Sequence, residues 1–462
     1  NYQIEKIYEL SKVKKILFEN AKESVNAIIF SNKQVHNNHF EYYPVEMGLF
    51  SEKPFELLII QEDKALYISK EDILNDKIKL RDYLIGNQFD LKLLKKLENY
   101  NRLDDYLLQL EGTDGKINNG IQIVGKEQLV EEFNLSENQY KSLNKDERKK
   151  YSNQFKLKYT RNTSDDLFTN PLISTKNLSN FELKEINVFV NDISNFHRIR
   201  NPKIYNTKKI LINRIGTRLK AFYSEDSIYY NFDIFSIFPA NDNWNHLFTA
   251  ILNSHLTNYF INSFYRKRND GSFPKIGYDA IRNIPIPKNL DNMELVNKIS
   301  KISQDLTMKK LAYNEEVENN LNQLIYNLYD LTYLEKQRVN DFFIKKSKIG
   351  KLDLKKYEQA LIESIAVYFE NSITIKYHHY TDFNLIVLGV YFNSEDNNKP
   401  DTDKVSKYML NEIFKDNPGE NFLASQEKIF AKDCIYILRK DDNTNWSETK
   451  AFEDGQEILN RA

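Results

Sequence analysis

Apolar residues recur along this chain with two different periods, and the alternation predicts both strands and helices. Residues 4–33 are expected to form a strand, a helix and a second strand, because apolar positions within 13–17 follow helical spacing and 25–30 is a β-branched run typical of a buried strand. A lone unit of this kind cannot cover both faces of its sheet. We therefore expect the rest of that sheet in another segment or another polypeptide.

The spacing of apolar residues changes twice in the middle of the chain. Residues 40–115 are predicted to mix short strands with amphipathic helices, because leucines recur at helical spacing at Leu91, Leu94, Leu97, Leu103, Leu107 and Leu110. A glycine-containing loop at 112–120 ends this region. Residues 116–288 are then predicted to be rich in short strands separated by turns, with apolar runs at 121–124, 209–212 and 235–238 and one helix at about 244–264.

The last third is predicted to be helical and then α/β. Apolar residues between 291 and 345 step by three and four, which predicts a long helical stretch. The remaining residues, 350–462, are expected to form a final α/β unit with a helix at 354–369, strands near 374–377, 385–392 and 434–438, and a terminal helix.

Composition narrows the class of protein. The length of 462 residues is enough for about two to four domains, and the apolar content of 41% is that of a globular protein. Cys434 is the only cysteine, which excludes an internal disulfide and a cysteine-based zinc cluster and fits a cytoplasmic protein. Neither a signal peptide nor an apolar run near the roughly 18 residues of a membrane span is visible, so no membrane partner is expected. The first residue is Asn1, not Met, which fits a fragment or a processed product.

Charge is distributed unevenly. The formal net charge is −1, so any nucleic-acid site must be a local patch. Lysine and arginine neutralise phosphates, and arginine also reads guanine in the major groove. Two basic clusters therefore predict contacts to double-stranded DNA, with a solvated basic face as the alternative. The first has eight basic residues and no acidic one between 196 and 220, and the second surrounds a flexible loop: Arg198, Arg200, Lys203, Lys208, Lys209, Arg214, Arg218 and Lys220, then Arg266, Lys267, Arg268, Ser272 and Lys275.

Catalytic constellations are not visible in the sequence. It has no GxxxxGK[ST] motif, which argues against phosphoryl transfer on a P-loop. His378 and His379 would point to opposite faces of a strand, and His36 and His39 lack a completing ligand at metal-site spacing. No metal site is expected. Two acidic pairs are interpreted as caps or solvated loops: Asp104–Asp105 and Asp165–Asp166.

Three short motifs follow one another in the second half of the strand-rich region. They are Leu252-Asn253-Ser254, the stretch GSFPKI at 271–276 and the stretch IPIP at 284–287. Together they resemble the closing segment of the target-recognition domain in Taq-type adenine-N6 DNA methyltransferases and the related fused restriction-methylation enzymes. The resemblance covers most of residues 1–345 in order. Residues 2–30 resemble the last strand-helix-strand part of the methyltransferase domain, 210–220 the strand pair of the recognition domain, and 322–332 a helix that follows it.

The resemblance implies a site residue, but it does not extend to the catalytic motifs of the family. It implies that Phe18 stacks on a flipped-out adenine, with plain core packing as the alternative. The family binds S-adenosylmethionine through a glycine-rich strand turn and holds the target amine with an Asn-Pro-Pro-aromatic or Asp-Pro-Pro-aromatic tetrapeptide. Neither motif occurs here, because the segments starting at Asn170 and Asn201 lack the second proline and the aromatic. We expect no catalytic residue and no cofactor in this chain, with S-adenosylmethionine implied for the complete enzyme.

The predicted fold is thus mixed, with α/β and α+β parts in five segments. They are a C-terminal remnant of a methyltransferase-like α/β domain with a partial sheet at 1–40, a helical or mixed connector at 41–115, a strand-rich DNA target-recognition domain at 116–288, a long helical spacer at 289–347 and a C-terminal α/β domain at 348–462. The last of these resembles less closely a tail domain of some large defence-associated methylases.

Three functions are compatible with these patterns, beside a different nucleic-acid binder, including one of RNA. The first is the DNA-recognition part of an adenine-N6 DNA methyltransferase from a restriction-modification or phage-defence system, with its catalytic motifs in another segment or subunit. The second is a non-enzymatic specificity subunit of a multisubunit restriction system, favoured by the helical spacer and opposed by the single recognition domain. The third is a self-contained nuclease or sensor with its chemistry in 350–462, although no catalytic set is visible there.

Overall fold

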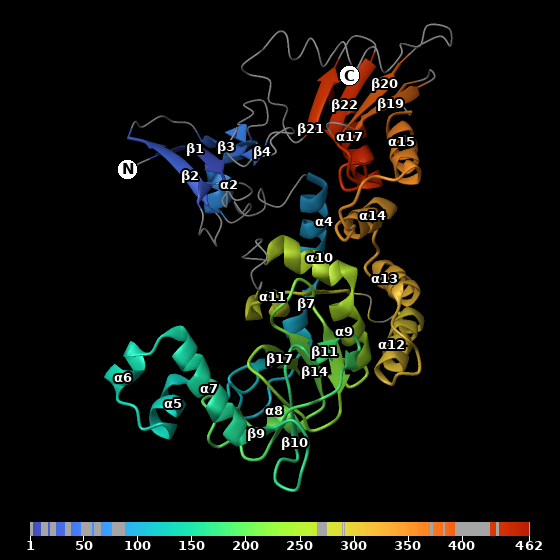
Figure 1. The fold of residues 1–462 in the computed structure, drawn as a ribbon. Helices are drawn as coiled ribbons and strands as arrows, with labels where there is room; N and C mark the ends of the chain where they lie inside the picture. The colour runs from blue at the N-terminus through green and yellow to red at the C-terminus, as the bar shows by residue number, and fades with distance from the viewer. Residues whose placement is uncertain are drawn as a thin grey trace. The chain divides into compact units, whose positions relative to one another are not determined.

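The computed structural model divides into two compact units, Asn1–Gly86 with Tyr333–Ala462 and Asn87–Thr332 (Figure 1). Helices and several small sheets are both present, which confirms the mixed fold class. No helix in the described part of the chain is long and apolar enough to cross a membrane. The structure describes residues 3–10, 17–18, 25–32, 38–47, 58–59, 66–75, 88–265, 275–288, 290, 292–366, 368–369, 373–381, 384–392, 426–430 and 434–461.

The N-terminal segment forms a four-stranded sheet of order β2-β1-β3-β6, in which β1 pairs antiparallel with β2 and parallel with β3. Its strands and neighbouring elements are β1 (Gln3–Glu9), β2 (Asn26–Ser31), β3 (His39–Pro44), β6 (Leu66–Ser69), the short pair β4 (Glu46–Met47) and β5 (Leu58–Ile59), and α2 (Lys70–Leu74). The sheet therefore continues beyond residue 40. The helix predicted between its first two strands lies mostly outside the described residues.

The prediction that 25–30 is a buried strand is wrong. The residues from Asn26 to Phe30 form a strand, but they are exposed on both faces, including Ile28, Ile29 and Phe30. The reason is position, since β2 is at the edge of the sheet and has a strand partner on one side only. The core of this sheet lies instead around Ile7 and Tyr42 on the inner strands.

Unit 2 is built on an antiparallel sheet of order β15-β14-β17-β8. Its strands are β8 (Ile117–Asn119), β14 (Lys209–Asn213), β15 (Ala221–Ser224) and β17 (Ile234–Ile237), so two of the predicted apolar runs are strands. Residues 121–124 form only isolated bridges. A second sheet, of order β16-β10-β13-β9, contains β9 (Thr160–Arg161), β10 (Asn170–Ile173), β13 (Phe189–Val190) and β16 (Tyr229–Tyr230). Two short pairs complete the strands: β11 (Leu178–Ser179) with β12 (Glu182–Leu183), and β7 (Asn101–Arg102) with β18 (Pro285–Ile286).

Several helices of unit 2 differ from the prediction. Leu94 and Leu97 are buried on a helix as expected, but the helical pattern ends after a single 3₁₀ turn at 103–106, because Leu107 bridges to Pro239. Three helices between 126 and 159, within the predicted strand-rich region, were not predicted. The elements are α4 (Gln88–Glu98), η2 (Leu103–Tyr106), α5 (Lys126–Glu132), α6 (Glu137–Ser142), α7 (Lys145–Tyr159), α8 (Lys203–Asn206) and α11 (Tyr278–Arg282).

The single helix predicted at 244–264 is two helices, α9 (Trp244–Asn253) and α10 (His255–Phe264). Ser254 separates them with an extended backbone, φ −68° and ψ 156°. Its hydroxyl oxygen accepts a hydrogen bond from the backbone N–H of Thr257, which is the bond that starts a new helix.

The long helical stretch predicted at 291–345 is also broken. It consists of α12 (Met293–Thr307), α13 (Glu315–Leu328) and α14 (Tyr333–Asp341). Positive φ angles of 55° at Lys309 and 49° at Asp330 interrupt the helical backbone between them. Helix α12 packs on α9 and α13 on α10, so these two helices belong to unit 2 and do not form a free spacer.

The C-terminal α/β domain has the predicted helices and strands. The elements are α15 (Lys351–Ile365), β19 (Thr374–Tyr380), β20 (Leu385–Tyr391), β21 (Gln426–Phe430), β22 (Cys434–Lys440) and α17 (Glu448–Arg461). The strands form an antiparallel sheet of order β19-β20-β22-β21. Helices α15 and α17 pack on this sheet through a shared core that includes Tyr357, Leu361, Ile386, Leu388 and Trp446.

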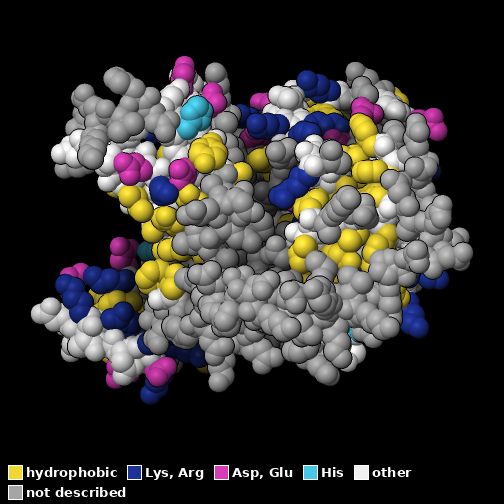
Figure 2. All heavy atoms as spheres, turned by 90° about the horizontal axis from the view of Figure 1, so that it is seen from above, with side chains coloured by type: hydrophobic (Ala, Val, Ile, Leu, Met, Phe, Trp, Pro, Cys, Tyr) yellow, Lys and Arg dark blue, Asp and Glu magenta, His cyan; other side chains and the backbone are white. Residues whose placement is uncertain are grey.

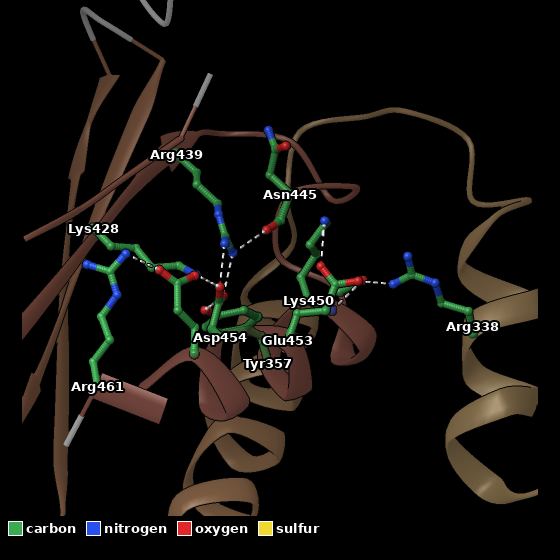
Figure 3. A network of polar contacts seen from close by, with 11 residues as sticks. Arg338, Tyr357, Lys428, Arg439, Asn445, Lys450, Glu453, Asp454 and Arg461 are labelled. Carbon is green, nitrogen blue, oxygen red and sulfur yellow. Dashed lines mark hydrogen bonds and ion pairs between the residues drawn. The ribbon is translucent and has the colours of Figure 1, made fainter. Parts of the chain in front are cut away.

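A buried ionic network joins this sheet to its helices (Figure 3). The carboxylate of Asp454 on α17 accepts hydrogen bonds from both terminal nitrogens of Arg439, at 2.6 Å each, and from the hydroxyl of Tyr357 at 2.5 Å. Lys428 Nζ lies 2.7 Å from the same carboxylate. Because Asp454 and Arg439 are almost completely buried, this pairing fixes how α17 lies on the sheet.

Candidate nucleic-acid interface

The hairpin between β14 and β15 carries three of the predicted basic residues on one tight loop, residues 214–220, which we call the basic loop. Asn213 organises it from inside, because its amide nitrogen donates to the carbonyls of Ile215 and Arg218 and its Oδ1 accepts from the N–H of Lys220. Gly216 has a φ of 142°, a conformation that residues with a Cβ rarely adopt. The loop is therefore held in one shape before any ligand binds.

Three asparagines on α9 and α10 brace the same loop from behind. The amide of Asn253 pairs with both the N–H and the carbonyl of Ala221, at 2.9 Å each. Asn258 Oδ1 accepts from the N–H of Leu219 at 2.6 Å, and Asn262 donates to the carbonyl of Thr217 at 3.3 Å. The Leu252-Asn253-Ser254 motif is therefore a structural joint that fixes the basic loop.

Arg214 opens the basic loop and is stacked on aromatic rings. Its guanidinium carbon lies 4.6 Å from the ring centroid of Phe232 and 5.6 Å from that of Phe235, and Arg198 stacks on Phe232 at 5.4 Å. The Nε and Nη1 atoms of Arg214 are buried and find no hydrogen-bond partner among the described residues. We call these four residues the arginine–aromatic cluster. The aromatic rings hold the plane of the Arg214 guanidinium in one orientation.

The structure brings Lys275 next to this cluster. Ile215 forms an antiparallel bridge with Lys275, and the N–H of Ile276 donates to the carbonyl of Arg214 at 2.8 Å. Lys275 is exposed. The end of the GSFPKI stretch therefore lies against the basic loop, which joins the two predicted basic clusters. The other members of the second cluster lie outside the described residues: Arg266, Lys267, Arg268 and Ser272.

Four more predicted residues form ion pairs near the surface. Three pair with one carboxylate each: Arg200 with Asp114 at 3.4 Å, Lys203 with Glu111 at 2.7 Å and Arg218 with Glu318 at 3.5 Å. Lys208 pairs with both Glu225 at 3.6 Å and Asp242 at 4.0 Å. Such surface pairs contribute about 0–1 kcal/mol, so a phosphate can displace the carboxylate. Lys220 is half-buried.

Lys209 does not fit the predicted role. Its side chain is 0% exposed, and its Nζ donates to the backbone carbonyls of Tyr205 at 2.7 Å, Thr207 at 3.2 Å and Asp226 at 2.8 Å. Burial lowers its pKa to about 8. We therefore remove Lys209 from the candidate interface, because a buried ammonium group held by three carbonyls cannot reach a phosphate.

One member of each acidic pair has the predicted capping role. Asp165 Oδ1 accepts hydrogen bonds from the N–H groups of Leu167 and Phe168, and Asp105 accepts from the N–H of Arg102. His379 pairs with Asp441 at 2.7 Å, while the ring of His378 stacks edge-on with Tyr380. His36 lies outside the described residues.

Phe18 is 47% exposed, and Leu17 is its only described neighbour along the chain. Its stacking role therefore stays a prediction.

Sequence reasoning missed Phe232 and Phe235, the rings that hold Arg214. It also missed the bracing role of Asn253, Asn258 and Asn262, although their spacing of five and four residues places them along one side of the helix pair.

Comparison with known proteins agrees with this location. Residues 170–286 match the model of the TaqI-like C-terminal specificity domain. No curated protein matches the chain. Among solved structures, the type IIG restriction endonuclease BpuSI aligns with 71% of this chain and 44% of its own, at 13% identity and a TM-score of 0.27. The type IIL restriction-modification enzyme MmeI, solved in complex with DNA, aligns with 73% of this chain and 46% of its own, at 10% identity and a TM-score of 0.33.

This chain thus spans less than half the length of either of these two proteins. The family match includes the basic loop, the arginine–aromatic cluster from Arg198 onward, and Lys275. It identifies residues 170–286 as a TaqI-like C-terminal specificity domain and supports DNA sequence recognition as the role of that domain.

Proposed function

We propose that this chain is the DNA-recognition part of an adenine-N6 DNA methyltransferase that belongs to a restriction-modification or phage-defence system. The observation that carries the proposal is the arginine–aromatic cluster beside Lys275. A half-buried arginine with a fixed plane suits bidentate hydrogen bonds to a guanine edge in the major groove, and an exposed lysine beside it suits a phosphate.

The two asparagines that precede a proline, Asn170 and Asn201, have structural roles in the described part of the chain. The amide of Asn170 donates to backbone carbonyls at Val190 and Asn191, and that of Asn201 donates to the carbonyls of Glu111 and Gly112. The nitrogens of both amides are thus used by backbone carbonyls. We propose that S-adenosylmethionine binds in another segment or subunit, because the sequence given has neither the glycine-rich strand turn nor the Asn-Pro-Pro-aromatic tetrapeptide.

The observed helices remove one argument for the alternative function, a non-enzymatic specificity subunit. The helical stretch that favoured it is broken, and α12 and α13 pack on α9 and α10. A co-purified or adjacent polypeptide with an Asn-Pro-Pro-aromatic motif supports the methyltransferase proposal. Its absence from every partner contradicts that proposal and leaves the specificity subunit.

DNA binding is tested with the full chain and a pool of random-sequence duplexes. We expect binding at about 50 mM salt that weakens steeply as salt rises, and enrichment of one sequence after repeated selection. Arg214→Ala and Lys275→Ala should both weaken binding. No binding at about 50 mM salt, with the partner present, would overturn the proposal.

A further inference from the structure

The helical lobe of unit 2, residues 126–161, lies outside the matched residues 170–286, and its second half, 141–161, has a basic surface. Between 141 and 161 it carries eight basic residues against two acidic ones, Asp146 and Glu147. The basic residues are exposed: Lys141, Lys145, Arg148, Lys149, Lys150, Lys156, Lys158 and Arg161. In a chain whose net charge is −1, this is a local concentration of positive charge.

Internal pairing leaves four of these lysines available. Lys158 pairs with Glu132 and Lys141 lies 4.0 Å from Glu137. The side chains of Lys145, Lys149, Lys150 and Lys156 have no ion pair or hydrogen bond among the described residues. The carboxylate of Glu147 is used at the start of α7, where it accepts from the N–H of Asn144 at 2.8 Å.

The four available lysines lie on the solvent side of α7. At about 100° per residue, Lys145, Lys149 and Lys156 fall within roughly 40° of one another, and Lys150 lies about 100° further round, away from the buried Phe155. The stripe from 145 to 156 is about 16 Å long at 1.5 Å per residue. One DNA strand carries about five phosphates over that length, at 3.4 Å per phosphate along the duplex axis.

The lobe is built as a rigid projection from the recognition fold. Phe155 is the only fully buried residue of the fifteen described residues in α7, and it packs with Leu129 in the core of unit 2. The C-cap of α7, Thr160, is the first residue of β9, which pairs with β13. Figure 1 shows the three helices projecting from the rest of unit 2, and Figure 2 shows lysine and arginine side chains gathered on the lobe.

We propose that this lobe is a second DNA contact, which binds the phosphate backbone of the duplex flanking the recognised sequence through Lys145, Lys149, Lys150 and Lys156. This inference rests on the proposed function, since the recognition surface brings the duplex to unit 2. Contacts of this kind add affinity and orientation without reading sequence.

The test measures how the affinity of the full chain for a selected duplex and for a scrambled duplex depends on salt. In the variant K145Q/K149Q/K150Q/K156Q, the slope of log affinity against log salt should fall by about 0.9 for each lost phosphate contact, or up to ~3.6 for four. Affinity at about 50 mM salt should fall roughly 10-fold or more for both duplexes. The ratio between the two duplexes should stay unchanged.

Two controls separate charge from structure. Replacing the same four lysines by arginine keeps the charge and should keep the slope. The variant K298Q/K310Q removes one exposed lysine on α12 and one that follows this helix. Figure 1 shows α12 on the opposite side of unit 2 from the lobe, so this variant should leave the slope unchanged.

The outcomes distinguish this inference from the proposed function. A wild-type chain that binds no duplex DNA overturns the proposed function and this inference with it. Wild-type binding with an unchanged slope in the glutamine variant overturns the lobe contact alone. If duplex RNA of the same sequence binds as tightly as DNA and loses affinity in that variant, the lobe belongs to RNA binding and the inference is wrong.

Discussion

Arg214 combines a fixed guanidinium plane with two buried nitrogens that lack a partner among the described residues. Leaving buried donors unsatisfied costs free energy, so the free protein holds a site that a correctly placed acceptor stabilises. The side-chain hydrogen bonds that hold the basic loop come from Asn213 and the bracing asparagines, and they all go to backbone groups. The described residues therefore offer no acceptor to the Nε and Nη1 atoms of Arg214.

Arg214→Lys should reduce sequence discrimination more than it reduces overall binding. Lysine lacks the planar fork that matches a guanine edge, so we expect a loss of about 1–3 kcal/mol of discrimination at one base pair. Competition between the selected duplex and its single-base variants measures this. Arg218→Lys on the same loop is the control and should leave discrimination unchanged. Equal weakening for every duplex would make Arg214 a phosphate contact instead.

Lys208 and Lys209 are neighbours with opposite environments, and substitutions should separate them. Lys209→Met should lower the free energy of unfolding by about 1–3 kcal/mol, because it leaves the carbonyls of Thr207 and Asp226 without their donor. DNA affinity should not change. Lys208→Met, at an exposed side chain, should lower DNA affinity and leave the free energy of unfolding unchanged. Thermal unfolding and duplex binding of both variants test this. If the folded Lys209→Met protein bound DNA more weakly than wild type, Lys209 would belong to the interface.

Charge counting found the right window but could not sort its members. A lysine count is the same for Lys208 and Lys209, but Lys208 lies just before β14 and is exposed, whereas all five residues of β14, Lys209 included, are buried. Strands β15 and β17, which pair with β14 on either side, come from elsewhere in the chain and cannot be read from a charge count. The stacking of Arg214 on Phe232 likewise depends on a contact that spacing does not reveal.

At the scale of elements, the joint between α9 and α10 explains why an asparagine stands in the Leu252-Asn253-Ser254 motif. The amide of Asn253 accepts from the N–H of Ala221 on β15 and donates to its carbonyl, which also accepts from the N–H of Phe181. The joint therefore couples the position of the helix pair to the shape of the basic loop.

Asn253→Ala should destabilise the fold by about 1–3 kcal/mol, because it leaves the buried N–H of Ala221 unsatisfied. Asn253→Asp should be at least as damaging, since it loses both donated hydrogen bonds and buries a charge. Asn262→Ala is the matched control: its amide is half-exposed, so water can replace it. Chemical denaturation measures all three. Unchanged stability with lost DNA affinity would show that Asn253 contacts DNA directly.

Element boundaries were predictable where local signals are strong. Ser136 with Gln139 and Asn144 with Glu147 form capping boxes that could have predicted α6 and α7 from sequence. The breaks at Lys309 and Asp330 carry no glycine or proline, so the apolar period runs across them without a visible stop.

At the scale of the molecule, the recognition surface and the C-terminal domain belong to different compact units. The C-terminal domain contains an ionic network whose stability depends on pH. Burial alone would raise the pKa of Asp454, yet Arg439 and Lys428 lower it to about 2. The pKa of an unfolded aspartate is about 3.9. Stability from this carboxylate is thus present above about pH 4 and lost as pH falls towards 2, which acid titration of unfolding should show.

Asp454→Asn should destabilise the C-terminal domain without changing DNA recognition. Removing one partner of a buried ion pair costs about 3–5 kcal/mol, because Arg439 and Lys428 would keep their charges in a buried site. Glu457→Gln, on the same helix and also paired with Lys428 but more exposed, should cost under about 1 kcal/mol. Thermal unfolding should show the larger loss for Asp454→Asn, while duplex affinity below its transition matches wild type. A parallel loss of affinity would show that recognition depends on the C-terminal domain, since the variant leaves the basic loop and Lys275 unchanged.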